Sequence, residues 1–232
     1  MIPGIVSSQV VDSGSWTPAD LGGALLTWLD ASDLTTLDLG GSDEVLGWTD
    51  KSPLALGEWQ GSGGAVWVSD VGLNSMPGMH FTGGLGLDNE NGPSSVSSSP
   101  WAMHMLVIES GSTNEGFYEG GDVLSGGLGV FGDKAGQWQV ASDVFTMTNS
   151  FSLSGYVLSI VSDASGSVDV YVDGSLVAFG SFYLEYMIGY LGYVPGTGQV
   201  FTGAIAEVVA HDYDTDDYDD ALLYLMTRYG LV

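Results

Sequence analysis

The segment SVDVYVDGSLVAF constrains the fold more than any other part of the chain. Val168, Val170 and Val172 alternate with polar or amphipathic residues, which predicts a strand with one buried and one solvent-exposed face. Asp173 and Gly174 follow, and an Asp-Gly pair favours the tight turn that joins two antiparallel strands. The segment therefore predicts an antiparallel β-hairpin.

Short apolar segments of the same kind recur along the chain between Gly, Ser, Asn and Asp residues. Of the 232 residues 36 are glycine and 44% are apolar, which suits many turns between short strands. No change of composition divides the segments, so they predict one all-β domain. They read LLTWLD, EVLGWTD, AVWVSD, GMHFTG, WAMHMLVIES, GYVLSIVSD and FTGAIAEVVAHD.

The N-terminal residues differ from this pattern. Residues 1–20 combine an apolar start, a Ser/Gly stretch and Pro18, which predicts an arm leading into a domain over residues 21–232. The apolar residues of the arm need a partner surface. No basic segment followed by an apolar segment opens the chain, and no apolar run approaches the roughly 20 residues of a membrane span. Neither an export signal nor a membrane anchor is therefore expected.

The charge balance is strongly acidic, with a net charge of -26 and only three basic residues, Lys51, Lys134 and Arg228. Such a chain repels nucleic acid and anionic membranes, so neither is an expected partner. High salt screens self-repulsion of this size, which suggests a marine or halophilic habitat. An acidic surface that only maintains solubility explains the same charge. The chain has no cysteine, which excludes disulfides and thiolate metal sites.

The C-terminal segment AHDYDTDDYDDALLYLMTRYGLV first suggests a calcium loop. Asp212, Asp214 and Asp216 match the first three ligand positions of an EF-hand. Asp217 then stands where the loop needs glycine, and Leu223 stands where it needs a bidentate carboxylate. The EF-hand interpretation therefore fails.

A helix explains this segment better. Thr215 is the expected N-cap, acidic residues occupy the first turn, and Arg228 occupies the last turn before Gly230. The apolar residues share one helical face, which predicts a terminal helix packed on the domain. They are Tyr218, Leu222, Leu225, Met226 and Tyr229.

The three histidines fall in three different predicted strands, and no two have the spacing of metal ligands. They are His80, His104 and His211. His104 shares its alternating face with Leu106 and Ile108, which predicts a hydrogen-bonded strand histidine.

Six segments in their order along the chain resemble the concanavalin A-like (laminin-G-like) jelly-roll domains of phage virion proteins and bacterial surface proteins. The resemblance implies an all-β, two-sheet antiparallel jelly-roll sandwich with a short C-terminal helix. The chain departs from the pattern at Pro53, where Gly is usual, and at Thr82, where Asp is usual. The segments are LLTWLDASDLTTL, VLGWTDKS, LNSMPGMHFTG, VDVYVDGSLVA, GAIAEVVAHD and LLYLMTRYGL.

Catalytic signatures are absent from the sequence. Hydrolases of this family carry an E-x-D-x-x-E string, because retention needs two carboxyl groups about 5 Å apart, and this chain has no such string. GLGVFG at 127–132 matches G-x-G-x-x-G, but a predicted strand follows it where a phosphate site needs a helix. Neither G-x-S-x-G nor H-E-x-x-H occurs. We therefore expect a protein that is not an enzyme and has no organic cofactor.

Two sets of residues are candidates for ligand binding. Tryptophans beside Gly-rich turns are expected to be partly exposed and to stack on sugar rings; these are Trp59, Trp67 and Trp138. Oxygen ligands gather in the segment LDNENG, where the resemblance implies a possible calcium site and a solvated turn is the alternative. This set comprises Asp88, Asn89, Glu90 and Asn91. Three other tryptophans, Trp28, Trp48 and Trp101, are expected to be buried in the core.

These observations favour a non-enzymatic virion structural protein, a phage head decoration or spike protein at the virion surface. Residues 1–20 would dock on capsid or other virion proteins, and the domain could form a homo-oligomer. The first alternative is a carbohydrate-binding module of a tail fibre or surface protein that recognises cell-surface glycans. The second alternative is a polysaccharide hydrolase whose acidic residues converge from distant segments.

Overall fold

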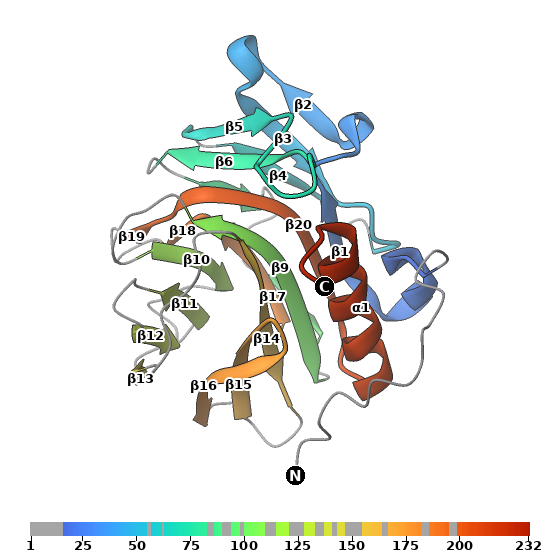
Figure 1. Ribbon diagram of the computed structural model, residues 1–232, viewed down its shortest axis with the longest axis vertical. Coiled ribbons are helices and arrows are strands. Elements are labelled where there is room, and N and C mark those ends of the chain that lie inside the picture. The colour runs from blue at the N-terminus through green and yellow to red at the C-terminus, as the bar shows by residue number, and fades with distance from the viewer. Residues whose placement is uncertain are drawn as a thin grey trace.

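In the part of the chain that the structure describes, two antiparallel β-sheets form a sandwich, and one α-helix, α1 (Thr215–Arg228), packs on the outside (Figure 1). This architecture confirms the predicted fold class. The computed structural model describes residues 16–54, 57–61, 63–82, 86–89, 94–97, 100–109, 115–120, 128–132, 137–140, 143–146, 155–163, 167–181, 186–194 and 199–232.

Sheet A has the order β16-β15-β14-β9-β20-β6-β5, and β1 pairs with the second half of β20. The predicted hairpin is β15–β16, and Asp173 and Gly174 have the positive φ angles, 48° and 74°, that its two-residue turn requires. The strands are β1 (Leu25–Asp30), β5 (Ala65–Val68), β6 (Gly78–Thr82), β9 (Trp101–Glu109), β14 (Tyr156–Ser162), β15 (Ser167–Val172), β16 (Ser175–Ser181) and β20 (Thr202–Asp212).

Sheet B has the order β13-β12-β11-β10-β17-β7-β4-β3-β2, and β8 pairs with β17. The G-x-G-x-x-G segment contributes β11, which pairs with β12. The strands are β2 (Leu37–Leu39), β3 (Val45–Thr49), β4 (Glu58–Gly61), β7 (Leu87–Asn89), β8 (Ser94–Ser97), β10 (Glu115–Gly120), β11 (Leu128–Gly132), β12 (Gln137–Val140), β13 (Asp143–Thr146) and β17 (Tyr186–Leu191). Shorter elements are η1 (Pro18–Ala24), η2 (Leu34–Thr36), η3 (Gly41–Asp43), β18 (Tyr193–Val194) and β19 (Gln199–Val200).

The main core lies between the two sheets, and alternation along β9 shows how it is built. Met103, Met105 and Val107 point into this core, whereas His104 and Leu106 point to the outer face of sheet A. Both faces of β9 are buried because α1 covers the outer one. This explains why the sequence of β9 is almost continuously apolar.

The helix α1 confirms the predicted C-terminal helix and its apolar face. Leu222, Leu225 and Tyr229 pack against Leu106 and Val157 on the outer face of sheet A. Within the described residues, no helix is long and apolar enough to cross a membrane.

The predicted N-cap is wrong by one residue. Asp214 is the N-cap, and its side chain accepts a hydrogen bond of 2.9 Å from the Asp216 N–H. Asp214 has the extended backbone (φ -127°, ψ 150°) that a cap requires, whereas Thr215 is already the first helical residue.

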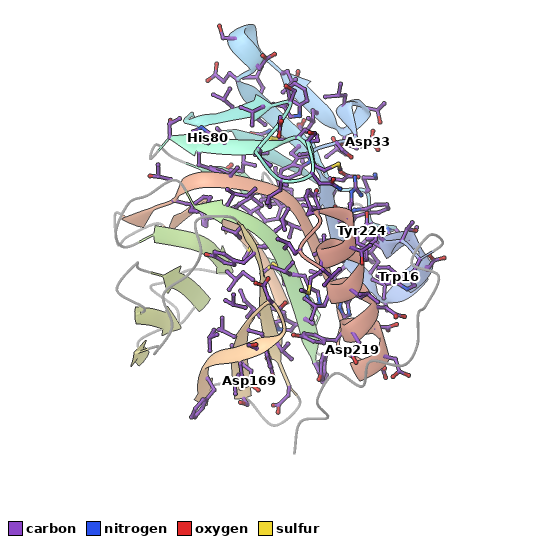
Figure 2. The ribbon with its side chains drawn as sticks, in the orientation of Figure 1. Trp16, Asp33, His80, Asp169, Asp219 and Tyr224 are labelled. Carbon is purple, nitrogen blue, oxygen red and sulfur yellow. The ribbon has the colours of Figure 1, made fainter. Side chains whose placement is uncertain are left out.

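Part of the predicted N-terminal arm packs on the domain. Leu21 of η1 packs with Leu25 and Val209, and Trp16 lies beside this cluster. The Trp16 ring also lies 5.7 Å from the ring of Tyr224 on α1, measured between centroids (Figure 2). The packed domain therefore includes residues 16–20, while residues 1–15 lie outside the described part, and docking by the arm stays a prediction.

Candidate functional sites

A β-bulge in β20 places a carboxylate under α1. Ile205 pairs with Val107 and Glu207 pairs with the next residue of β9, Leu106, so Ala206 is the extra residue of the bulge. Ala206 packs in the cluster between sheet A and α1, and Glu207 turns to the same outer face. The bulge thus buries an acidic side chain beneath the last turns of the helix.

Glu207 has no exposed surface, and its two oxygens are surrounded by donors. Oε1 accepts hydrogen bonds from Trp28 Nε1 at 2.9 Å and from the Tyr224 hydroxyl at 3.1 Å. Oε2 accepts one from the Tyr229 hydroxyl at 3.2 Å and lies 3.3 Å from Arg228 Nη1. Burial raises the pKa of Glu207 to about 7, against the opposing effect of Arg228.

Arg228 links Glu207 to a second buried carboxylate, that of Asp30. Its Nη2 lies 3.2 Å from Asp30 Oδ1 and donates a hydrogen bond of 2.6 Å to Ser32 Oγ. Lys51 continues the network, with Nζ 3.4 Å from Asp30 and 3.0 Å from Asp33. The same ammonium lies 3.9 Å above the centroid of the Trp28 ring. We call the residues Trp28, Asp30, Ser32, Asp33, Lys51, Glu207, Tyr224, Arg228 and Tyr229 the charge cluster.

The charge cluster has the geometry of a structural link. Each of its three carboxylates lies within 3.4 Å of one of its two cations, so no charge of the cluster lacks a partner of opposite sign. It joins β1, the loop after β3, β20 and α1. A buried carboxylate with a raised pKa is often catalytic, but a general acid must reach the substrate, and Glu207 is fully covered. The cluster therefore holds the helix on the sheet.

A second buried polar group confirms the prediction for His104. The His211 Nδ1–H donates to the Asp212 carbonyl at 2.8 Å, which leaves His211 Nε2 as an acceptor. His104 Nε2–H then donates to it at 3.3 Å, and His104 Nδ1 accepts from the Ser159 hydroxyl at 2.8 Å. Burial lowers the pKa of both histidines, so both are neutral at pH 7.

The predicted sugar-stacking tryptophans do not form one surface. Trp59 is 1% exposed and faces the core beside its cross-strand partner Trp48, so the expectation of partial exposure is wrong. Trp59 lies in a strand whose alternation turns it inward, although glycines flank the strand. Trp67 is half-buried and its Nε1–H donates to the Ala31 carbonyl at 3.0 Å. The side chain of Trp138, on β12, lies outside the described residues, and binding by Trp67 and Trp138 stays a prediction.

Two of the three predicted core tryptophans are fully buried. These are Trp48 and Trp101. Trp28 is half-buried instead, because its indole belongs to the charge cluster, where it donates a hydrogen bond to Glu207 and lies beneath the Lys51 ammonium.

The four predicted calcium ligands are only partly described. Asp88 and Asn89 are consecutive residues of β7, so their side chains point to opposite faces of sheet B. Asn89 is 4% exposed and Asp88 is half-buried. Glu90 and Asn91 lie outside the described residues. Within the described part of the chain, no three acidic or histidine side chains gather as metal ligands, and calcium binding stays a prediction.

The open face of sheet B carries a row of polar side chains that the sequence did not single out. The row crosses five strands, because each residue pairs with the next: Asp38, Gly47, Gln60, Asp88 and Tyr190. The neighbouring residues of these strands, Trp48, Trp59, Leu87 and Leu191, all lie in the core. The row therefore faces away from the core, and we call it the polar row.

The side chains of the polar row remain accessible. Asp38 and Gln60 are exposed, and Asp88 and Tyr190 are half-buried. Glu58 adds a carboxylate beside the row, and it lies over Gly47, where a Cβ atom would overlap with it. This face combines carboxylates, an amide and a phenol on adjacent strands, which suits a ligand rich in hydroxyl groups. The alternation of Trp59 with Gln60 and of Leu87 with Asp88 is the sequence signal that could have located it.

Comparisons with known proteins show the fold of the chain. Neither a protein-family model nor a curated protein matches its sequence. The solved structure of Trypanosoma rangeli sialidase with the inhibitor DANA matches with a TM-score of 0.59 at 18% identity, over 88% of this chain and 33% of the sialidase. The same enzyme with 2,3-difluoro-KDN matches with a TM-score of 0.56, again at 18% identity and over the same shares of the two chains.

A separately solved domain also matches. Domain 4 of the extracellular arabinanase AbnA from Geobacillus stearothermophilus, in complex with arabinotriose, has a TM-score of 0.50 at 16% identity, over 69% of this chain and 82% of that domain. The chain thus has a β-sandwich fold, and its structural neighbours named here are a sialidase and a domain of an arabinanase.

These neighbours correct one prediction and leave others untested. The prediction that the chain is not an enzyme is contradicted, since it was drawn from missing catalytic strings and this fold occurs in sialidases. At 18% identity the likeness shows the fold alone, and the chain spans a third of the sialidase. None of the neighbours named above is a phage protein, so the virion role and the virion-surface location stay predictions.

Proposed function

We propose that this chain is a carbohydrate-binding domain and that the polar row on sheet B is its binding surface. The observation that carries the proposal is the alignment of Gln60, Asp88 and Tyr190 on three adjacent strands, all facing away from the core. Strands within a sheet do not move relative to one another as loops do. The sheet therefore holds these groups ready for a ligand, which lowers the entropy lost on binding.

The chemistry of the three side chains suits sugar hydroxyl groups. The Gln60 amide can donate to one hydroxyl and accept from another, and the Asp88 carboxylate can accept from two. The Tyr190 ring offers an apolar face for the C–H groups of a sugar ring, and its hydroxyl offers a further hydrogen bond. Neighbouring strands lie about 4.8 Å apart, which spreads these groups over the length of an oligosaccharide.

The structural neighbours support the same class of ligand. Domain 4 of the arabinanase was solved with arabinotriose, and the sialidase was solved with sialic acid and with the inhibitor DANA. The fold of this chain thus occurs in proteins that bind sugars.

Affinity electrophoresis through gels that contain soluble polysaccharides tests the proposal. We expect retardation in at least one polysaccharide, and a dissociation constant raised about two- to tenfold in Gln60→Ala, the size of one lost hydrogen-bonding group. Tyr190→Ala should weaken binding similarly through the lost stacking surface. Thr227→Ala, at an exposed position of α1, is the control. Retardation that is equal in all four proteins contradicts the proposed surface.

A further inference from the structure

We infer that the polar row binds an uncharged oligosaccharide that runs across the strands, and that it rejects sugars bearing a carboxylate. This inference rests on the proposed function and specifies its ligand. It separates the chain from its sialidase neighbours, whose ligands include the acidic sugar sialic acid.

The charges on the open face of sheet B disfavour ligands that carry a carboxylate. Asp38, Glu58 and Asp88 all lie on the open face of sheet B, on or beside the polar row. Proteins recognise carboxylate ligands mainly through Arg and Lys, and the fork of Arg matches two carboxylate oxygens. Among the described residues of this face there is no basic side chain.

The basic residues of the chain are held elsewhere. Lys51 and Arg228 belong to the charge cluster, where they are paired with Asp30, Asp33 and Glu207. Arg228 of α1 contacts Glu207 on the outer face of sheet A, and Lys51, in the loop after β3, contacts Asp30 and Asp33. Lys134, the third basic residue, lies outside the described residues.

A sugar carboxylate on the polar row would meet like charges at short range. At hydrogen-bonding distance from Asp88 it would also come near Glu58, which lies two residues along β4 from Gln60, the cross-strand partner of Asp88. The combined repulsion corresponds to at least about a tenfold loss of affinity relative to a neutral sugar of the same shape. Neutral hydroxyl groups instead donate hydrogen bonds to these carboxylates, and bonds to charged acceptors are the stronger kind.

The direction and length of the polar row favour an oligosaccharide over a single sugar. Its residues are cross-strand partners, so the row runs at right angles to the strands from β2 to β17. Four strand spacings of about 4.8 Å give a length of roughly 19 Å, which exceeds one sugar ring. Gly47 in the row has no side chain, and the Glu58 side chain lies over it, so a carboxylate continues the row at this position. Affinity should therefore increase from a monosaccharide to an oligosaccharide.

Isothermal titration calorimetry with two sets of oligosaccharides tests the inference. The neutral set contains fragments of arabinan, xylan and β-glucan, and the acidic set contains polygalacturonate fragments and sialyllactose. At low salt we expect the native chain to bind a neutral oligosaccharide and to bind each acidic one at least about tenfold more weakly. Asp38→Lys places a cation at the end of the row and should strengthen binding of acidic fragments. Asp219→Lys makes the same charge change on α1 and should not (Figure 2).

The outcomes separate the inference from the proposed function. Acidic sugars that bind the native chain as tightly as neutral ones, with a loss of binding in Gln60→Ala, would overturn the inference and leave the proposed function standing. Equal gains in Asp38→Lys and Asp219→Lys would also overturn it, because net charge rather than the row would then decide. Binding of neither set, or binding that is unchanged in Gln60→Ala, would refute the proposed function itself.

Discussion

Replacing Arg228 by methionine should destabilise the fold strongly, because this side chain neutralises two buried carboxylates. Arg228→Met keeps much of the apolar stem of the side chain and removes its charge. Glu207 has no exposed surface and the Asp30 side chain is 5% exposed, so water cannot replace the lost partner fully. Glu207 keeps three neutral donors, on Trp28, Tyr224 and Tyr229.

The expected cost follows from this burial. Removing one partner of a buried ion pair typically costs about 3–5 kcal/mol. The Arg228 side chain is itself 22% exposed, so the lower end, about 3 kcal/mol, is expected. Lys51→Met is the matched control, since Lys51 is similarly exposed at 21% but pairs partly with Asp33, which is 30% exposed. It should cost about 1 kcal/mol, the sum of a surface pair and a cation–π contact.

Urea unfolding at pH 8 measures these differences, provided that the slope of free energy against urea stays constant. The double variant Glu207→Gln/Arg228→Met should lose about 1–3 kcal/mol less than the two single variants together. A loss below about 1 kcal/mol in Arg228→Met, or strict additivity, would refute the charge cluster as the link between helix and sheet.

The pH dependence of Arg228→Met gives a second test of the same argument. Without Arg228 the pKa of Glu207 should rise further above its unfolded value, since burial and Asp30 still raise it and only the hydrogen bonds from Trp28 and Tyr224 oppose them. A raised folded pKa means that the folded chain binds the extra proton. Stability is then greatest at acidic pH and is lost as pH rises through the folded pKa. The deficit of Arg228→Met should therefore be smaller at pH 5 than at pH 8, and a larger deficit at pH 5 would contradict the account.

Three further predictions concern α1 and the buried histidines. Leu225→Ala should cost about 2–5 kcal/mol in urea unfolding, because Leu225 has no exposed surface, and a smaller loss would show that the helix packs loosely. Asp214→Ala should cost about 0.5–2 kcal/mol as the lost N-cap, and Thr215→Ala less than that, with the reverse order contradicting the cap assignment. The lowered pKa of His104 gives stability that is present above about pH 6.5 and lost as pH falls. His104→Gln should therefore lose less stability than the native chain between pH 7 and pH 5, as measured by melting temperature.

The features that local patterns determine could be predicted from the sequence. The β15–β16 hairpin depends on alternation and on two residues that tolerate positive φ, and both signals lie within one short segment. The apolar face of α1 depends on helical periodicity alone. The error of one residue at its N-cap arose because Asp214 and Thr215 are both good caps, and only the backbone angles distinguish them.

The features that long-range pairing determines could not be predicted. The charge cluster combines residues from four segments that lie far apart in the sequence, and only the fold brings them together. They are Asp30, Lys51, Glu207 and Arg228. The bulge at Ala206 turns the Glu207 side chain toward the other residues of the charge cluster, and no local sequence pattern predicts this bulge.

The polar row was missed for the same reason. Its members are single residues on five strands, and only the strand register aligns them. Trp59 was predicted to bind sugars because it is an aromatic residue near glycines, but its neighbour Gln60 is the residue that faces solvent.

Chemical-shift mapping tests the central claim, sugar binding on sheet B, most directly. Backbone amide spectra of the isotope-labelled chain would be recorded during titration with a neutral oligosaccharide. We expect the largest shifts at Gly47, Gln60, Asp88 and Tyr190, which the register places in one row, and no comparable shifts in α1 on the outer face of sheet A. Shifts centred on α1 or on the charge cluster, or no shifts with any neutral oligosaccharide, would contradict the account.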